Sequence, residues 1–71
     1  MTTLTLNGET RHFDTPAAGE FTVAALLDEL ALTGKRVAVE RNGEIVPKSQ
    51  HGKTVLAEGD VIEVVVAVGG G

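Results

Sequence analysis

Alternating apolar and polar positions at the start of the chain predict a β-hairpin. Leu4 and Leu6 fall on one face of a strand over residues 3–6, with threonines on the other face. The pair Asn7-Gly8 follows, and it is typical of a type I′ turn because both central positions of that turn need a positive φ. We therefore expect an antiparallel returning strand over residues 9–14.

A helical pattern begins after a loop over residues 15–20. Thr22 suits the N-cap position, because its hydroxyl can accept a hydrogen bond from a free backbone N–H of the first turn. The apolar residues that follow it fall at i, i+3, i+4 and i+7 and so form one stripe: Val23, Leu26, Leu27 and Leu30. Gly34 is expected to end this helix in the left-handed conformation.

A second hairpin is predicted after the helix. Residues 36–41 alternate valines with mostly polar positions, and Asn42-Gly43 provides another two-residue turn. The partner strand over residues 44–46 should stop at Pro47, which cannot donate a ladder hydrogen bond. Residues 54–56 are expected to form a short edge strand or a turn.

The last strand is expected over residues 61–68, after a turn at Gly59. Glu63 sets its orientation, because the face that carries this carboxylate should meet solvent. The core-facing side chains are then Ile62, Val64 and Val66, while Val65 and Ala67 share the outward face with Glu63.

This order of elements predicts an α+β fold of the ubiquitin-like β-grasp type. One main helix would pack on a mixed sheet of four to five strands. The domain should cover residues 1–68, with residues 69–71 as a flexible C-terminal glycine tail.

Composition and charge exclude several classes of function. Hydrophobic residues make up 42% of the chain, so we expect a packed core, although the aromatic residues are limited to Phe13 and Phe21. The net charge of −4 disfavours nucleic acid and anionic membranes as partners, and the chain lacks cysteine, which rules out thiolate chemistry. With no apolar run long enough to span a bilayer, we expect a cytoplasmic protein.

The polar residues do not predict an enzyme. His12 and His51 have no ligand spacing, so we expect surface histidines and no metal site. No hydroxyl has a neighbouring base that the sequence places beside it, so we expect no catalytic residue. The acidic residues are spaced as on a solvated face, and they could also steer the protein towards a basic docking surface: Asp28, Glu29, Glu58, Asp60 and Glu63.

The glycine run Gly69-Gly70-Gly71 follows directly on the last strand. It could be a frayed terminus, but a tail without Cβ atoms can also thread a narrow channel in a partner, and three extended residues reach about 10 Å. A free carboxylate on Gly71 is a poor electrophile, whereas adenylation would turn it into a mixed anhydride that sulfur or nitrogen can attack. Beside this tail, Val65, Ala67 and Val68 form either a docking patch or part of a mostly buried strand.

Several segments together resemble the ThiS family of sulfur carriers. They are residues 6–9, 22–30, 39–47 and 58–64 and the terminal Gly70-Gly71, which cover nearly the whole chain in the right order. The loop over residues 15–21 is longer than usual for the family, and His51 stands where relatives often carry an aromatic residue.

The resemblance implies a carrier that other enzymes act on, with no bound cofactor. A ubiquitin-activating-like (ThiF-like) adenylyltransferase would adenylate Gly71 with ATP, and a cysteine desulfurase persulfide would supply sulfur for a thiocarboxylate. A ThiG-like thiazole synthase would then use this sulfur to build the thiazole ring of thiamin. The family's essential pair corresponds to Gly70 and Gly71.

Other functions remain open at the level of sequence. The same tail chemistry serves carriers for molybdopterin, cysteine or tRNA thiolation. A ubiquitin-like modifier would instead join Gly71 to a lysine of a target protein, and a plain interaction module would carry an inert tail.

Overall fold

The computed structural model describes residues 1–15 and 20–67. Within these residues the chain forms an α+β fold with a five-stranded mixed sheet and one α-helix, as predicted for a ubiquitin-like β-grasp. The elements are β1 (Thr2–Leu6), β2 (Glu9–Phe13), α1 (Val23–Glu29), β3 (Val37–Arg41), β4 (Glu44–Val46), the 3₁₀ helix η1 (Lys48–Gln50) and β5 (Val61–Val66).

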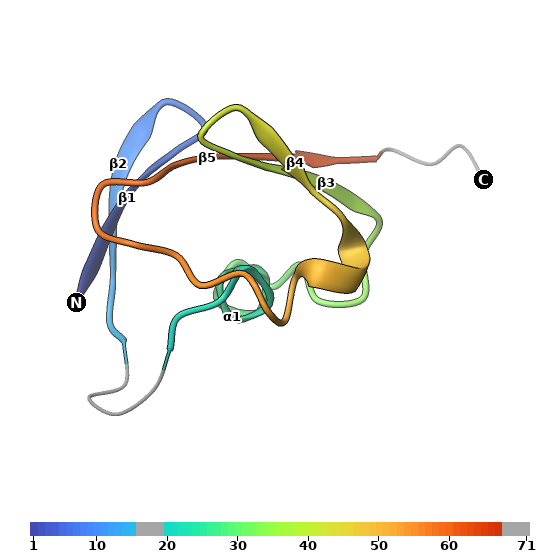
Figure 1. Cartoon of the computed structure of the whole chain (residues 1–71), viewed down its shortest axis with the longest axis horizontal. Coiled ribbons are helices and arrows are strands. Elements are labelled where there is room, and N and C mark those ends of the chain that lie inside the picture. Colours follow the sequence, from blue (N-terminus) through green and yellow to red (C-terminus); the bar gives the residue numbers. More distant parts are fainter. Residues whose placement is uncertain (16–19, 68–71) are drawn as a thin grey trace.

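The last strand lies in the middle of the sheet. The strand order is β2-β1-β5-β3-β4, and β5 pairs parallel to β1 and antiparallel to β3. Figure 1 shows α1 lying against one face of this sheet while β5 runs across the centre of the other layer. The segment that leads to the glycine run is therefore held by strands on both sides over its first half.

Both predicted Asn-Gly turns are confirmed. Asn7 and Gly8 have φ angles of 49° and 83°, and Asn42 and Gly43 have angles of 51° and 86°. These are the positive values that a type I′ turn requires. The first turn joins β1 to β2 in a five-pair antiparallel ladder that runs from Leu6 opposite Glu9 to Thr2 opposite Phe13.

The helix begins where predicted but ends earlier. The Thr22 hydroxyl accepts a hydrogen bond from Ala25 N–H at 3.2 Å and so caps the N-terminus. The predicted end at Gly34 is wrong, because the residue after the C-cap in the left-handed conformation is Ala31, with φ 59°. Leu32 N–H donates to Leu27 C=O at 2.8 Å and Ala31 N–H donates to Asp28 C=O at 3.0 Å, which is the Schellman pattern.

The core lies between α1 and the sheet. Its fully buried side chains come from both layers: Leu4, Val23, Leu26, Val39 and Ile62. The prediction that Val66 joins them is wrong, since its side chain is 41% exposed. Val66 lies opposite Val37 at the end of the β3–β5 ladder, and a helix of seven residues, about 10 Å long, does not cover this end.

The segment over residues 54–56 does not lie at a sheet edge. Val55 forms a single bridge with Thr22, and Leu56 N–H donates to Phe21 C=O at 2.8 Å. The segment therefore pairs with the entry to α1, and this pairing buries Leu56 in the core.

One of the two histidines is not on the surface as expected. His51 is 9% exposed, and its Nε2 donates to Val46 C=O at 3.1 Å, so the ring fills space beside β4. His12 is exposed, and its Nδ1 lies 2.9 Å from the Thr3 hydroxyl on the neighbouring strand. No helix within residues 1–15 and 20–67 is long and apolar enough to cross a membrane.

Candidate functional site

The candidate site is the end of β5, where the chain leaves the sheet towards the glycine run. Val65 and Ala67 belong to the described part of this segment, whereas Val68, Gly69, Gly70 and Gly71 lie outside the described residues. The described part of the site consists of the contacts that position β5 and the side chains around its end.

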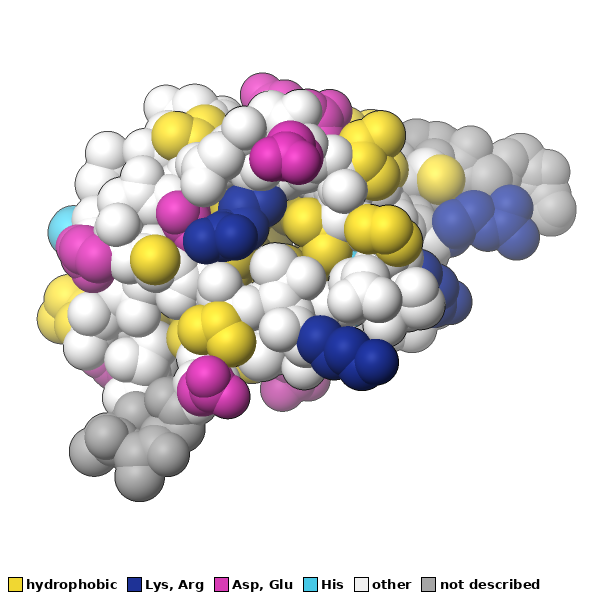
Figure 2. Space-filling view, in the orientation of Figure 1, with side chains coloured by type: hydrophobic (Ala, Val, Ile, Leu, Met, Phe, Trp, Pro, Cys, Tyr) yellow, Lys and Arg dark blue, Asp and Glu magenta, His cyan; other side chains and the backbone are white. Residues whose placement is uncertain are grey.

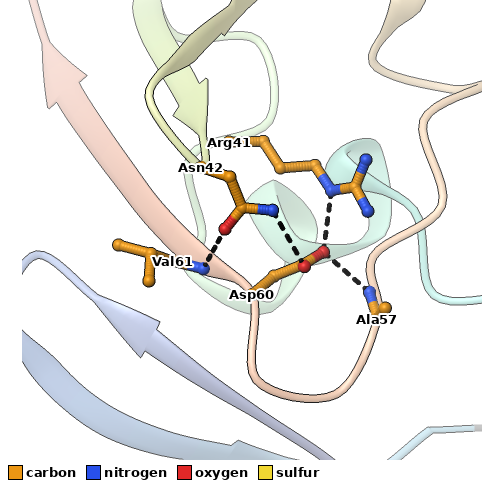
Figure 3. A network of polar contacts seen from close by, with 5 residues as sticks. All are labelled: Arg41, Asn42, Ala57, Asp60 and Val61. Carbon is orange, nitrogen blue, oxygen red and sulfur yellow. Dashed lines mark hydrogen bonds and ion pairs between the residues drawn. The ribbon is translucent and has the colours of Figure 1, made fainter.

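A polar network fixes the start of β5 (Figure 3). The Asp60 carboxylate accepts hydrogen bonds from Arg41 Nε at 2.7 Å, Asn42 Nδ2 at 3.1 Å and Ala57 N–H at 2.8 Å. Asn42 Oδ1 in turn accepts from Val61 N–H at 2.8 Å. The end of β3 and the start of β5 are thus joined through one nearly buried carboxylate.

The expectation that Asp60 belongs to a solvated face is wrong, because its side chain is only 10% exposed. Burial by itself would raise the pKa of Asp60. The hydrogen bonds from Ala57, Arg41 and Asn42 and the charge of Arg41 outweigh that effect, so the pKa lies below the ordinary aspartate value. Asp60 is therefore ionised at neutral pH and stabilises the turn that sets the register of β5.

Glu58 also binds backbone close to the start of β5. Its Oε1 accepts a hydrogen bond from Thr3 N–H at 2.8 Å, and the bonds from the Thr3 backbone and hydroxyl lower its pKa. The carboxylate remains fully open to solvent. Its position ties the turn before β5 to the first strand.

Asn7 continues the ladder on the β1 side after that strand has ended. Its Nδ2 donates to Val64 C=O at 3.2 Å, and its Oδ1 accepts from Val64 N–H at 2.8 Å. On the other side, Ala67 N–H donates to Arg36 C=O at 2.9 Å. Hydrogen bonds with the Asn7 side chain and with the Arg36 backbone therefore hold β5 in place as far as the last described residue.

The outward face of β5 is apolar near its end, as predicted from Glu63. Val65 is 62% exposed, and Ala67 is exposed as well. Val65 lies opposite Ala38 of β3, which is exposed on the same face. This arrangement offers a partner a small apolar surface next to the glycine run, while the docking role of Val65, Ala67 and Val68 stays a prediction.

The structure brings together one cluster of polar residues that was not predicted from the sequence. Thr3 and His12 lie opposite each other in the β1–β2 ladder, and Glu58 binds the Thr3 backbone. The register imposed by the two-residue turn at Asn7-Gly8 could have revealed this pair. The group is open to solvent and lies at the end of β1 far from the end of β5, so we assign it no part in the site.

Within residues 1–15 and 20–67, no group of three or more His, Asp or Glu side chains is placed to hold a metal ion. The residues around the end of β5 supply backbone hydrogen bonds and apolar surface. Such an arrangement can hold and present a chain segment to a partner protein.

Comparison with known proteins identifies the family of this chain and several relatives. The model of the ThiS family matches residues 4–71. The Bacillus subtilis sulfur carrier protein ThiS is 46% identical over 50 residues, which cover 70% of this chain and 76% of that protein. A crystal structure of the thiamine biosynthesis protein ThiS from Geobacter metallireducens superposes with a TM-score of 0.78 at 32% identity, over 99% of this chain and all of that one.

Two longer relatives have a different name. A thiazole synthase of Paramagnetospirillum magneticum is 47% identical over 68 residues, and one of Magnetococcus marinus is 42% identical over 66 residues. The matches cover 96% and 93% of this chain but only 20% and 19% of those proteins. The chain thus spans about one fifth of the length of these thiazole synthases.

Proposed function

The chain belongs to the ThiS family, and we propose that it is a sulfur carrier for thiazole formation in thiamin biosynthesis, with Gly71 as the group that carries the sulfur. The observation that carries this proposal is the family match, which extends through β5 and the glycine run to Gly71. The name of the Bacillus subtilis relative and the description of the Geobacter metallireducens relative support the same function.

The proposed chemistry takes place at the α-carboxylate of Gly71. A carboxylate oxygen attacks the α-phosphorus of ATP in the site of an adenylyltransferase, which releases pyrophosphate and forms an acyl-adenylate. The outer sulfur of a cysteine persulfide, supplied by a desulfurase, then attacks the acyl carbon, AMP leaves and an acyl disulfide forms. A thiol attacks the inner sulfur of this disulfide, so a new disulfide forms and the thiocarboxylate of Gly71 leaves. The thiocarboxylate that results donates its sulfur to a thiazole synthase.

The fold supports this role because it holds the strand that leads to the glycine run, while the partner enzymes would carry out the chemical steps. Asn7, Asn42 and Asp60 fix β5 within the sheet, so a partner meets a strand of defined direction. Glycines at positions 69–71 have no side chains that would obstruct a narrow channel or shield the carboxylate. Adenylation, sulfur supply and ring formation would then be carried out by the partners, and ATP would be bound by the adenylyltransferase.

Thiazole synthase is supported as a partner by the two longer relatives. In proteins of that name, a region similar to nearly all of this chain makes up one fifth of the length. We propose that this protein also binds a thiazole synthase, which uses the thiocarboxylate of Gly71 as its source of sulfur.

The experiment is an adenylation assay with ATP labelled at its α-phosphate and a ThiF-like adenylyltransferase. The wild-type protein should form a labelled acyl-adenylate, whereas a variant without Gly70 and Gly71 should form none. Gly70→Val is the finer test, because a branched side chain next to the terminal residue should slow adenylation while the folded domain stays unchanged. Equal labelling of the wild type and the shortened variant would disprove the role of Gly71.

A further inference from the structure

A cavity lies on the helix side of the sheet, near the start of β3. It has a volume of about 340 Å³ and opens between α1, the loop before β3, and η1 with the two residues after it. Its apolar lining comes from both layers of the fold: Ala24, Leu27, Leu32 and Val37. Leu32 and Val37 are only partly buried, so the cavity exposes apolar side chains that pack against the core.

The rim of this cavity is positively charged. Lys35, Arg36 and Lys48 line it, and these are three of the six Lys and Arg residues in a chain with a net charge of −4. Among the residues that the structure describes, no Asp or Glu lines the cavity. Figure 2 shows Lys and Arg side chains gathered on the side where β5 ends, while many acidic side chains lie over the rest of the face.

Two contacts between β5 and the residues before and at the start of β3 connect the cavity to the site. Arg36 on the rim accepts the hydrogen bond from Ala67 N–H through its carbonyl oxygen. Val37 in the lining lies opposite Val66, and opposite residues of an antiparallel ladder point to the same face of the sheet. The half-exposed Val66 side chain therefore faces the same side as the cavity, next to the point where the chain leaves β5.

We propose that this cavity docks an acidic segment with an apolar side chain, presented by the adenylyltransferase that activates Gly71. The apolar side chain fills the cavity, and flanking carboxylates meet Lys35 and Lys48 on the rim. The proposal rests on the proposed function, and it adds a second contact on the helix side of the sheet to the apolar face around Val65.

The chemistry of the cavity favours such a peptide over other occupants. A phosphate group alone would make no apolar contact with the partly exposed Leu32 and Val37 and so would gain little from them. An anionic membrane or a nucleic acid would extend beyond the basic rim over the acidic remainder of the surface, and the net charge of −4 disfavours such an extended partner. Buried apolar anchors with a charged rim are typical of protein–protein interfaces. Adenylation is shared by every carrier pathway considered, so the enzyme of that step is the partner we assign.

The test measures adenylation at varied carrier concentration, with the full-length protein and a ThiF-like adenylyltransferase. Lys35→Glu and Lys48→Glu should each raise the KM for the carrier by about fivefold at low salt, with kcat unchanged, and the effect should shrink as salt rises. Arg11→Glu is the matched control: it changes the charge by the same amount on the exposed surface of β2 and should alter KM by less than about twofold.

The apolar part of the proposal needs its own variant. Ala24→Phe, at an exposed helix position that lines the cavity, should fill it and raise KM by a factor that does not depend on salt. Thr10→Phe on β2 provides the same change elsewhere and should leave KM unaltered. Thermal unfolding of each variant shows whether it is folded.

The outcomes separate the two proposals. Absence of adenylate from the wild-type protein would overturn the proposed function and with it this inference. Normal adenylation by the wild type with the same KM for Lys35→Glu, Lys48→Glu and Arg11→Glu would overturn the docking site alone. A loss in kcat with KM unchanged would also overturn it, because a docking contact acts on binding.

Discussion

The side chain of Asn7 binds both backbone groups of Val64, 57 residues further along the chain, as a neighbouring strand would. β1 stops pairing with β5 at Leu6 opposite Ile62, so the Asn7 amide extends the ladder by one step. The same residue has the positive φ that the first hairpin needs. One asparagine therefore sets both the turn of the hairpin and the position of the strand that leads to the glycine run.

Asn7→Gly should destabilise the protein by about 1–3 kcal/mol. Glycine tolerates the positive φ, so the loss comes from Val64, whose backbone N–H and C=O would lose their partner. Urea denaturation measures the free energy of unfolding, and hydrogen exchange of the Val64 amide reports the local effect. Amides of β3 serve as the internal control, and unchanged exchange at Val64 would contradict the assigned role.

Asp60→Asn should lower the free energy of unfolding by about 2 kcal/mol at pH 7, since an amide cannot accept all three hydrogen bonds from Arg41, Asn42 and Ala57. The pKa of Asp60 is lowered in the folded protein, so its stabilisation is present above the ordinary value of 3.8. It is lost as the pH falls through the folded pKa.

The pH dependence separates this account from a simple packing defect. The difference between wild type and Asp60→Asn should be constant from neutral pH down to about 5 and should shrink in more acidic solution. Chemical denaturation across this range measures it. A difference that stays the same at low pH would show that the charge of Asp60 is not what stabilises the turn.

The hydrophobic pattern and turn residues predict most of the fold because their effects are local. Alternation around Leu4 and Leu6, the stripe from Val23 and the two Asn-Gly pairs each fix an element by its own chemistry. The prediction that the helix ends at Gly34 is wrong because Ala31 adopts the left-handed conformation, which glycine adopts more readily. The local sequence pattern does not predict that an alanine adopts the left-handed conformation in spite of its steric cost.

Burial near the ends of elements depends on contacts between segments far apart in the sequence. The alternation in β5 correctly orients Val65 outward, but the exposure of Val66 depends on how far the short helix reaches. His51 and Asp60 are buried because β4 and the end of β3 supply their partners. The terminal glycine motif is enough to single out Gly70 and Gly71 from the sequence. The cavity beside Val37 is formed by segments far apart in the chain, so it can be identified only from the folded structure.

Ala31→Gly should stabilise the protein by about 0.5–1 kcal/mol. Glycine removes the steric cost of the left-handed conformation at φ 59°, and this gain exceeds the added freedom of the unfolded chain. Ala24→Gly within α1 is the matched control and should destabilise by a similar amount. Urea denaturation of both variants measures the effect, and loss of stability in both would refute the account of the helix end.

Val65→Glu should weaken binding to the adenylyltransferase without affecting the fold. The side chain is 62% exposed, so the free energy of unfolding should change by less than about 0.5 kcal/mol. If the outward face of β5 docks the enzyme, the KM for the carrier should rise about tenfold. Val55→Glu places the same charge at another exposed valine, and an equal effect on KM from both variants would argue against a specific docking face.

The central claim, that Gly71 carries sulfur, is tested most directly by intact mass spectrometry of the protein purified from its native cells. The account predicts a fraction of the protein in which one oxygen is replaced by sulfur, and fragmentation should place this sulfur on Gly71. A chain whose Gly71 is joined to a lysine of another protein, or sulfur that is absent from that residue while the sulfur-transfer partners are present, would contradict it.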